Sequence, residues 1–136
     1  MTEWNDALVA YRLERAREAL AEARLLADHS YANACVNRLY YACFYAVIAL
    51  LHAHGLSAGK HSGVRSLFGR HFVKTGLVSK ELAAVYNDLF EYRQESDYED
   101  FFRVDPDVLG PWLAQTERFI EAIGILLSTG QAKEVG

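Results

Sequence analysis

Arg93 is the residue whose type and place in the sequence most directly suggest chemistry. Apolar residues recur every three or four positions before it, and Arg93 takes the next place on this stripe, four residues after Leu89. A guanidinium can bind a phosphate through two parallel hydrogen bonds. The alternative is structural: an arginine near a helix C-terminus complements the helix dipole, extends its charge to water, or pairs with an acid one turn on, here Asp97.

A second set of candidates lies in the segment NACVNRLYYACFY, where Asn37, Tyr41 and Tyr45 recur every four residues and so share one helix face. The surrounding helix is otherwise apolar, and a buried amide or hydroxyl without a partner costs ~1–3 kcal/mol. Either an interhelical hydrogen-bond network or a ligand site would supply these partners. We expect Asn37 or Tyr41 to lie near Arg93.

Two other motifs fit neither a nucleoside triphosphate loop nor a metal site. In GLSAGKH, residues 55–61, three residues separate the glycines instead of four, and His61 stands where a phosphate-binding loop has Ser or Thr. His52 and His54 are two residues apart and face different sides of a helix, whereas His61 and His71 lie among basic residues. We therefore expect no metal site and no cofactor.

Charge is distributed unevenly along the chain. The net charge of −4 argues against indiscriminate binding of nucleic acid. Residues 29–80 contain six lysines and arginines and no acid, whereas residues 81–107 contain nine acids and two arginines. Each half could simply solvate its own face, or the basic half could form an electropositive surface for a phosphate-bearing partner.

The strong hydrophobic periods are all helical. Helices are predicted at residues 5–27, 31–54 and 61–74, a fourth begins after Ser79, and a fifth begins at Asp105. Short connections make neighbouring helices antiparallel. The sequence therefore predicts an all-α, antiparallel up-and-down bundle of four long helices and one short helix. It forms a single domain over residues 1–130, followed by a frayed C-terminal tail at residues 131–136.

Local signals set the ends of these helices. Ser30 is predicted to cap the second helix and Gly55 to end it. Ser79 is predicted to cap the fourth helix. Asp105 supplies a capping acid before a proline, and Pro111 is expected to restart or kink the last helix.

The cysteines and the apolar runs bear on location. Cys35 and Cys43 are eight residues apart in one predicted helix, roughly 12 Å at 1.5 Å per residue, which is too far for a disulfide. They are predicted to be buried free thiols, which fits a reducing cytoplasm. The uncharged run Leu39 to Leu51 has thirteen residues, fewer than the ~20 that span a membrane. We expect a cytoplasmic protein without a signal peptide and without a membrane partner.

Three segments together, NRLYYACFYA, KHSGVRSLFGRHFVKTG and YRQESDY, resemble the HEPN (higher eukaryotes and prokaryotes nucleotide-binding) superfamily. The resemblance covers roughly Leu8 to Leu127 and is strongest to small stand-alone prokaryotic members, often encoded beside a minimal nucleotidyltransferase. It implies a four- to five-helix bundle that forms a homodimer. Many such relatives are metal-independent ribonucleases that act as toxins, with an arginine followed after four to six residues by a histidine.

In those relatives two copies of the motif meet across the dimer, and the 2′-hydroxyl of RNA is the nucleophile. The paired nucleotidyltransferase is the antitoxin and can adenylylate a tyrosine near the motif. Here Arg93 matches the arginine, but Tyr98 stands at the histidine position. Tyrosine, with a pKa of about 10 in model compounds, is a poor base at neutral pH, although it can donate a hydrogen bond. Binding of a phosphate therefore survives this change more readily than catalysis does.

Three hypotheses remain open. The first is a toxin-like HEPN dimer that works with a nucleotidyltransferase, with weak, altered or absent ribonuclease activity. The second is a non-catalytic nucleotide-binding partner of that enzyme, and the third is a helical protein-interaction domain. Arg93 and Tyr98 are the predicted catalytic residues. The residues predicted to contact a nucleotide or RNA are Asn37, Arg38, Tyr41, Lys60, His61 and Asp97.

Two further expectations follow from the candidate site. The dimer surface is predicted to include some of the aromatic residues that crowd around the acidic segment, namely Tyr92, Phe101, Phe102 and Trp112. The substitution Arg93→Ala is expected to spare the fold and to weaken RNA binding or cleavage.

Overall fold

The computed structural model describes residues 3–98 and 102–129, and it is helical. The long helices are α1 (Glu3–Asp28), α2 (Ala32–Ala53), α4 (Lys80–Tyr98) and α5 (Leu109–Thr129). Shorter elements are α3 (His61–Phe68), the π-helical turn η1 (Gly69–Val73) and the 3₁₀ turn η2 (Pro106–Val108). These ranges contain no strand. The all-α prediction of four long helices and a short one is confirmed, and the predicted tail lies outside the described residues.

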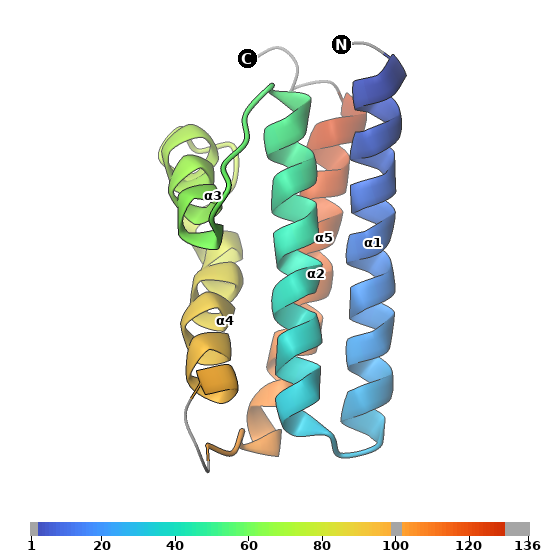
Figure 1. The fold of residues 1–136 in the computed structure, drawn as a ribbon, viewed down its shortest axis with the longest axis vertical. Coiled ribbons are helices and arrows are strands. Elements are labelled where there is room, and N and C mark those ends of the chain that lie inside the picture. Colours follow the sequence, from blue (N-terminus) through green and yellow to red (C-terminus); the bar gives the residue numbers. More distant parts are fainter. Residues whose placement is uncertain (1–2, 99–101, 130–136) are drawn as a thin grey trace.

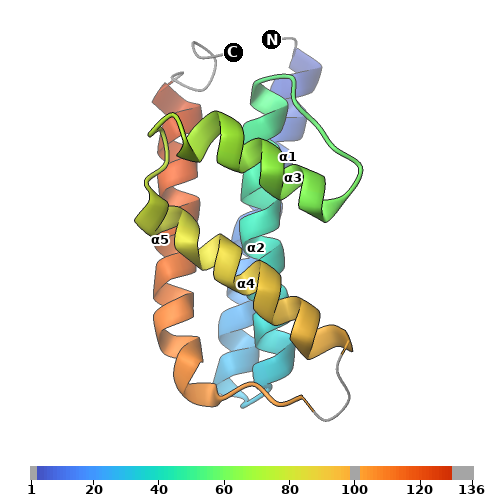
Figure 2. The ribbon, with the colours of Figure 1, turned by 90° about the vertical axis from the view of Figure 1, so that its left-hand side faces the viewer.

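The helices form a bundle with α2 at its centre. Figure 1 shows α1, α2 and α5 side by side, with α1 running opposite to the other two. Figure 2 shows α3 and α4 crossing α2 and α5 obliquely, so that they cover the face of α2 that α1 does not. Both α3 and α4 therefore lie against the part of α2 that carries the candidate residues.

Helix α2 is the most deeply buried element, as its apolar composition predicts. Its middle, from Leu39 to Leu51, is buried on nearly every side, and Cys35 and Cys43 are buried free thiols. Among the described helices it alone is long and apolar enough to span a membrane, but most of its apolar stretch is packed inside the bundle. Such burial is the behaviour of a core helix.

The turn between α1 and α2 corrects one prediction. Ser30 does not cap α2; it has a φ of 66° and ends α1. The N–H of Ser30 donates to the carbonyl of Ala27 at 3.0 Å, and the N–H of Tyr31 donates to the carbonyl of Leu26 at 2.8 Å. This is the Schellman pattern, which needs its penultimate residue in the left-handed conformation. The need to close α1 therefore takes precedence over a serine cap for α2, whose N-cap residue is Tyr31.

The helix ends predicted at Gly55 and Ser79 are confirmed, whereas Asp105 caps the 3₁₀ turn η2 and α5 begins at Leu109. Gly55 has a φ of 72° and ends α2 through the same Schellman pattern. The hydroxyl of Ser79 accepts a hydrogen bond from the N–H of Leu82 at 3.1 Å. The carboxylate of Asp105 accepts one from the N–H of Asp107 at 3.0 Å. Pro111 lies in the first turn of α5, where a helix does not need its N–H.

The predicted dimer surface is partly used within the chain. Tyr92 packs edge-on against Phe102 and Trp112, with ring centroids 5.4 and 4.9 Å away. All three rings are half-buried. Phe101 lies outside the described residues. These contacts give the rings a role in the monomer, and the homodimer itself stays a prediction.

Candidate functional site

Arg93 is buried on the inner face of α4, as its place on the apolar stripe predicts. Its side chain is 8% exposed. The guanidinium carbon lies 4.5 Å from the ring centroid of Tyr40 and 5.7 Å from that of Tyr41, both on α2. The structure therefore contradicts the alternative in which Arg93 extends its charge into bulk water, and the predicted proximity of Tyr41 is confirmed.

Tyr40 connects Arg93 to α3. Its side chain is completely buried, and its hydroxyl oxygen lies 2.9 Å from Nδ1 of His61, the first residue of α3. Phe90 packs edge-on against the ring of Tyr40, which keeps the ring in place between α2 and α4. Burial raises the pKa of Tyr40 to about 12, although the charge of Arg93 opposes this shift. Tyr40 is therefore a neutral phenol at physiological pH.

His61, on a third helix, completes the Arg93 cluster, which consists of Arg93, Tyr40, Tyr41 and His61. Its ring lies 4.3 Å from that of Phe44 and 5.9 Å from that of Tyr41, measured between centroids. Burial, and after it the positive charge of Arg93, lower the pKa of His61 from its ordinary value of 6.5. The imidazole is therefore neutral at pH 7. Its side chain is half-buried, so solvent or a ligand can reach it.

Asn37 and Arg38 extend the cluster toward the surface. Nε and Nη2 of Arg38 donate to Oδ1 of Asn37 at 3.3 and 3.2 Å, and Nη1 donates to Glu22 at 3.2 Å. The guanidinium carbon of Arg38 lies 5.1 Å from the ring centroid of Tyr41. Tyr41 therefore has two guanidinium groups within cation–π distance, those of Arg38 and Arg93.

Arginine and aromatic side chains also meet along the boundary of α1 and α2. Arg15 donates to the Tyr45 hydroxyl at 3.5 Å and lies 5.2 Å from the centroid of that ring. Nη1 of Arg12 lies 3.3 Å from Nδ1 of His52. Sequence reasoning missed Arg12 and Arg15 because they lie on the mixed-charge face of α1, where only the packing of α1 on α2 reveals their partners.

The remaining predicted residues lie outside the core of the cluster. Tyr98, at the end of α4, is 76% exposed. Five residues of helix place it roughly 7.5 Å along the axis and about 140° around it from Arg93. Lys60 is exposed and directly precedes α3. The side chain of Asp97 lies outside the described part of the chain. The structure thus brings Tyr41 and His61 to Arg93, and it places Tyr98 on another side of α4.

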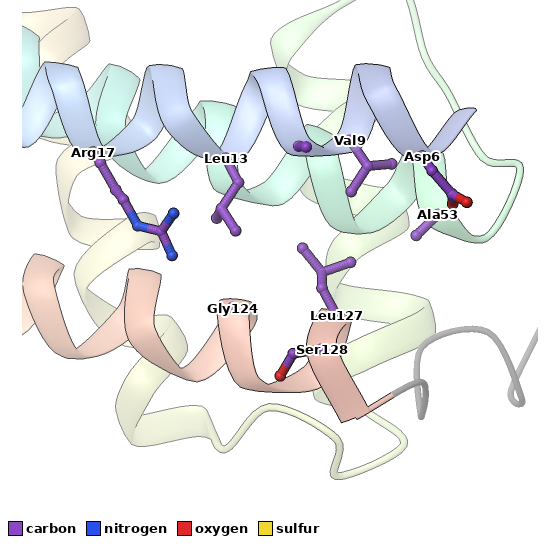
Figure 3. Close-up of a pocket in the computed structure, with 9 residues that line it drawn as sticks. Asp6, Val9, Leu13, Arg17, Ala53, Gly124, Leu127 and Ser128 are labelled. Atoms are coloured by element: carbon purple, nitrogen blue, oxygen red, sulfur yellow. The ribbon is translucent and has the colours of Figure 1, made fainter. Parts of the chain in front are cut away.

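A separate cavity of about 320 Å³ lies where α1, α5 and the end of α2 meet. Figure 3 shows Leu13 and Arg17 of α1 extending toward α5, with Leu127 on the opposite wall. The guanidinium of Arg17 is 3.9 Å from the carboxylate of Glu14. None of the residues that line this cavity belongs to the Arg93 cluster, so it is a distinct feature of the bundle.

Comparison with known proteins supports the resemblance. The sequence profile of the HEPN domain family matches residues 9–126. A UPF0332 protein of Thermotoga maritima is 44% identical over 122 residues, which cover 90% of this chain and 92% of the relative. A Methanocaldococcus jannaschii protein named "putative toxin" is 36% identical over 87 residues, covering 64% of this chain and 59% of the relative. A UPF0332 protein of Gloeobacter violaceus is 36% identical over 113 residues, covering 80% and 87%.

Proposed function

Because the chain belongs to the HEPN domain family, we propose that it is a toxin-like protein that binds RNA at Arg93 and cleaves it without a metal ion. The observation that carries this proposal is the buried guanidinium of Arg93 on two tyrosine rings, with a reachable neutral imidazole beside it. Two relatives from M. jannaschii are named "putative toxin", which supports the toxin-like part.

The chemistry of the cluster suits a single-stranded RNA. Arg93 can hold a phosphate through two hydrogen bonds, because its guanidinium is planar and fixed in place by Tyr40. Tyr41 and Tyr45 are half-buried and offer rings on which unpaired bases stack. Arg15 and Arg38 lie beside these two rings and add positive charge for neighbouring phosphates.

We further propose that the protein acts as a homodimer. Within one chain Arg93 and Tyr98 face different sides of α4, so in a shared site the Tyr98 beside each Arg93 would come from the second copy, where an adenylyl group on its hydroxyl would block RNA. A two-fold axis would supply that residue to both sites at once. Sedimentation at micromolar concentration should give twice the chain mass of 15.3 kDa. A monomer under these conditions would contradict the shared site.

The proposed partner is a minimal nucleotidyltransferase, as in the small HEPN proteins that this chain resembles. Tyr98 supports this proposal, because it is a tyrosine close to Arg93 in sequence and its side chain is 76% exposed. An adenylyl group on its hydroxyl would add bulk and negative charge near the end of α4 and would repel RNA. Growth arrest by this protein should be relieved when the partner enzyme is produced in the same cells.

A second function is favoured by one observation. Tyr98 replaces the histidine of the family motif, so the chain could bind RNA or a nucleotide for its partner without cleaving it. Cleavage of a labelled oligoribonucleotide in the presence of EDTA separates the two functions. The proposed nuclease yields fragments with 2′,3′-cyclic phosphate ends, whereas the binding module gives a mobility shift and intact RNA.

The variant Arg93→Lys tests whether the site is the one proposed. Lysine keeps the positive charge but loses the two-pronged hydrogen bond, so cleavage should fall by roughly tenfold or more. Arg70→Lys is the matched control, since Arg70 is exposed on η1, and it should cleave like the wild type. Equal activity of Arg93→Lys and the wild type would contradict the proposed site, and a wild type that neither binds nor cleaves RNA would contradict the function.

A further inference from the structure

We propose that His61 is the general base that takes the proton from the attacking 2′-hydroxyl, and that Tyr40 is the residue that positions it. This assignment rests on the RNA cleavage proposed above. It places the proton-transferring group at the start of α3, whereas the family motif places a histidine after the arginine on α4, where this chain has Tyr98.

The position of the His61 ring is fixed by two contacts. The Tyr40 hydroxyl lies 2.9 Å from Nδ1, and the ring of Phe44 packs against the imidazole at 4.3 Å between centroids. Because Nδ1 is engaged by Tyr40, Nε2 is the nitrogen that remains for a substrate proton. His61 is half-buried and reachable, while Tyr40 is completely buried and cannot itself meet the RNA.

The same tyrosine ring positions both reactive groups. The face of Tyr40 carries the guanidinium of Arg93 at 4.5 Å, and its hydroxyl holds His61. A phosphate bound by Arg93 therefore brings its neighbouring ribose toward the imidazole. Holding the reacting groups in one rigid arrangement is a large part of what an enzyme supplies to such a reaction.

The surroundings of His61 favour its neutral form, which is the form a base needs. The titratable or charged groups in contact with it or acting on it are Tyr40 and Tyr41 from α2 and Arg93 from α4. In sequence it follows Lys60, and Arg65, one turn later on α3, is paired with Glu91 of α4 at 3.0 Å. Burial and the charge of Arg93 both lower the pKa of the imidazole. A lone pair is therefore present at pH 7.

The proposed step conserves atoms and protons. Nε2 of His61 takes the 2′-hydroxyl proton while the 2′-oxygen forms a bond to phosphorus. The bond from phosphorus to the 5′-oxygen breaks, and that oxygen takes a proton from water. The products are a 2′,3′-cyclic phosphate and a 5′-hydroxyl. The imidazolium is stabilised by Nδ1–H donating to the Tyr40 oxygen, and it then releases its proton to solvent.

Other histidines have other surroundings. His52 contacts Arg12 in the last turn of α2, and the ring of His54 packs edge-on against Phe72 at 4.7 Å. His29 is exposed in the turn between α1 and α2. His71 lies on η1, where its charge acts on His54. Among the histidines His61 is therefore the one that a phosphate held at Arg93 would approach.

The test compares His61→Gln with the wild type on a labelled oligoribonucleotide, in EDTA, from pH 5 to pH 8.5. Glutamine can still hydrogen-bond to Tyr40 but cannot take up a proton. His29→Gln is the matched control. Affinity is measured separately with the 2′-O-methyl form of the same oligonucleotide, which lacks the nucleophile and cannot be cleaved.

We expect His61→Gln to lose about 100- to 10,000-fold in kcat, the usual contribution of a general base. Its affinity for the 2′-O-methyl oligonucleotide should be close to that of the wild type. The wild-type rate should fall at acidic pH with a midpoint below 6.5, and this acid limb should be missing from the residual rate of the variant. Tyr40→Phe keeps the ring over which Arg93 lies but removes the hydroxyl that contacts Nδ1 of His61. This variant should therefore shift the acid limb and lower kcat without abolishing cleavage.

Two outcomes separate this inference from the function on which it rests. Undiminished cleavage by folded His61→Gln, with the acid limb retained, overturns the role of His61 and leaves the nuclease standing. A wild type that does not cleave RNA at any pH overturns both. If His61→Gln does not fold, the pKa of His61 in the wild type, measured by NMR, must match the midpoint of the acid limb; a mismatch overturns the inference.

Discussion

Arg93→Ala and Arg93→Lys together test whether the buried arginine serves the fold, the RNA or both. Arg93 is 8% exposed, and its guanidinium carbon lies 4.5 Å from the ring centroid of Tyr40 and 5.7 Å from that of Tyr41. A cation–π contact is worth ~0.5 kcal/mol when exposed and ~2 kcal/mol or more when desolvated. Removing the side chain should therefore cost roughly 1–3 kcal/mol of unfolding free energy. The sequence alone predicts that Arg93→Ala spares the fold, and the buried contacts of Arg93 add this cost in stability.

The expected loss of function is larger than the loss of stability can explain. A hydrogen bond to a charged group contributes ~1.5–3 kcal/mol, which is roughly a ten- to hundredfold effect on binding or rate. A protein that is stable by ~5–15 kcal/mol stays folded after losing 1–3 kcal/mol. Arg93→Ala should therefore be folded at 25 °C, melt several degrees lower, and bind RNA at least tenfold more weakly.

Arg93→Lys separates the role in stability from the role in RNA binding. Lysine keeps a cation near Tyr40 but lacks the planar guanidinium that can donate two parallel hydrogen bonds to a phosphate. Arg93→Lys should melt closer to the wild type than Arg93→Ala does and still lose about tenfold in affinity for the 2′-O-methyl oligonucleotide. Melting is followed by circular dichroism and binding by fluorescence anisotropy on the same samples. Wild-type affinity in both variants, together with a lower melting temperature, would show that Arg93 serves the bundle alone.

Three further predictions concern other parts of the molecule. Ser30→Gly should raise the unfolding free energy by about 0.5–1 kcal/mol, since glycine adopts the φ of 66° without strain; a lower melting temperature would contradict the Schellman assignment. The pKa values of His52, His54 and His61 are lowered in the folded protein, so the unfolded chain binds protons first as the pH falls. Urea titrations should therefore give a lower unfolding free energy at pH 5.5 than at pH 7.5. An equal or higher value at pH 5.5 would contradict these shifts. Tyr98→Phe should cleave RNA like the wild type but gain no adenylyl mass from the partner enzyme, and adenylylation of that variant would place the modified residue elsewhere.

The helices were predictable because each depends on local sequence. The apolar period placed Arg93 on the buried side of α4, and Ser79 and Gly55 identified helix ends correctly. Ser30 was not predictable in this way, because serine is compatible both with a cap and with a left-handed turn. The short connection between α1 and α2 selects the left-handed turn at Ser30, because the geometry of this connection follows from how the two helices pack.

The site was only partly predictable, for a related reason. Tyr41 and Arg93 could be paired because each is a polar group on an apolar helix face that needs a partner. The hydrogen bond between Tyr40 and His61 has no such signal, since Tyr40 resembles an ordinary core aromatic and His61 an ordinary turn residue. Only the oblique crossing of α3 over α2 brings the two side chains together (Figure 2).

The crossing of α3 over α2 also offers an explanation for the tyrosine at position 98. An arginine and a histidine five residues apart on one helix differ by about 140° around the axis, so at that spacing a second copy would bring the two together. In this chain the contact of Tyr40 with both Arg93 and His61 assembles a guanidinium and an imidazole inside one bundle. If His61 provides the base, position 98 is not needed for proton transfer, and the exposed phenol of Tyr98 can serve as the residue that a partner modifies. Catalysis and regulation would then depend on different residues, and the paired tests of His61→Gln and Tyr98→Phe should show the two losses independently.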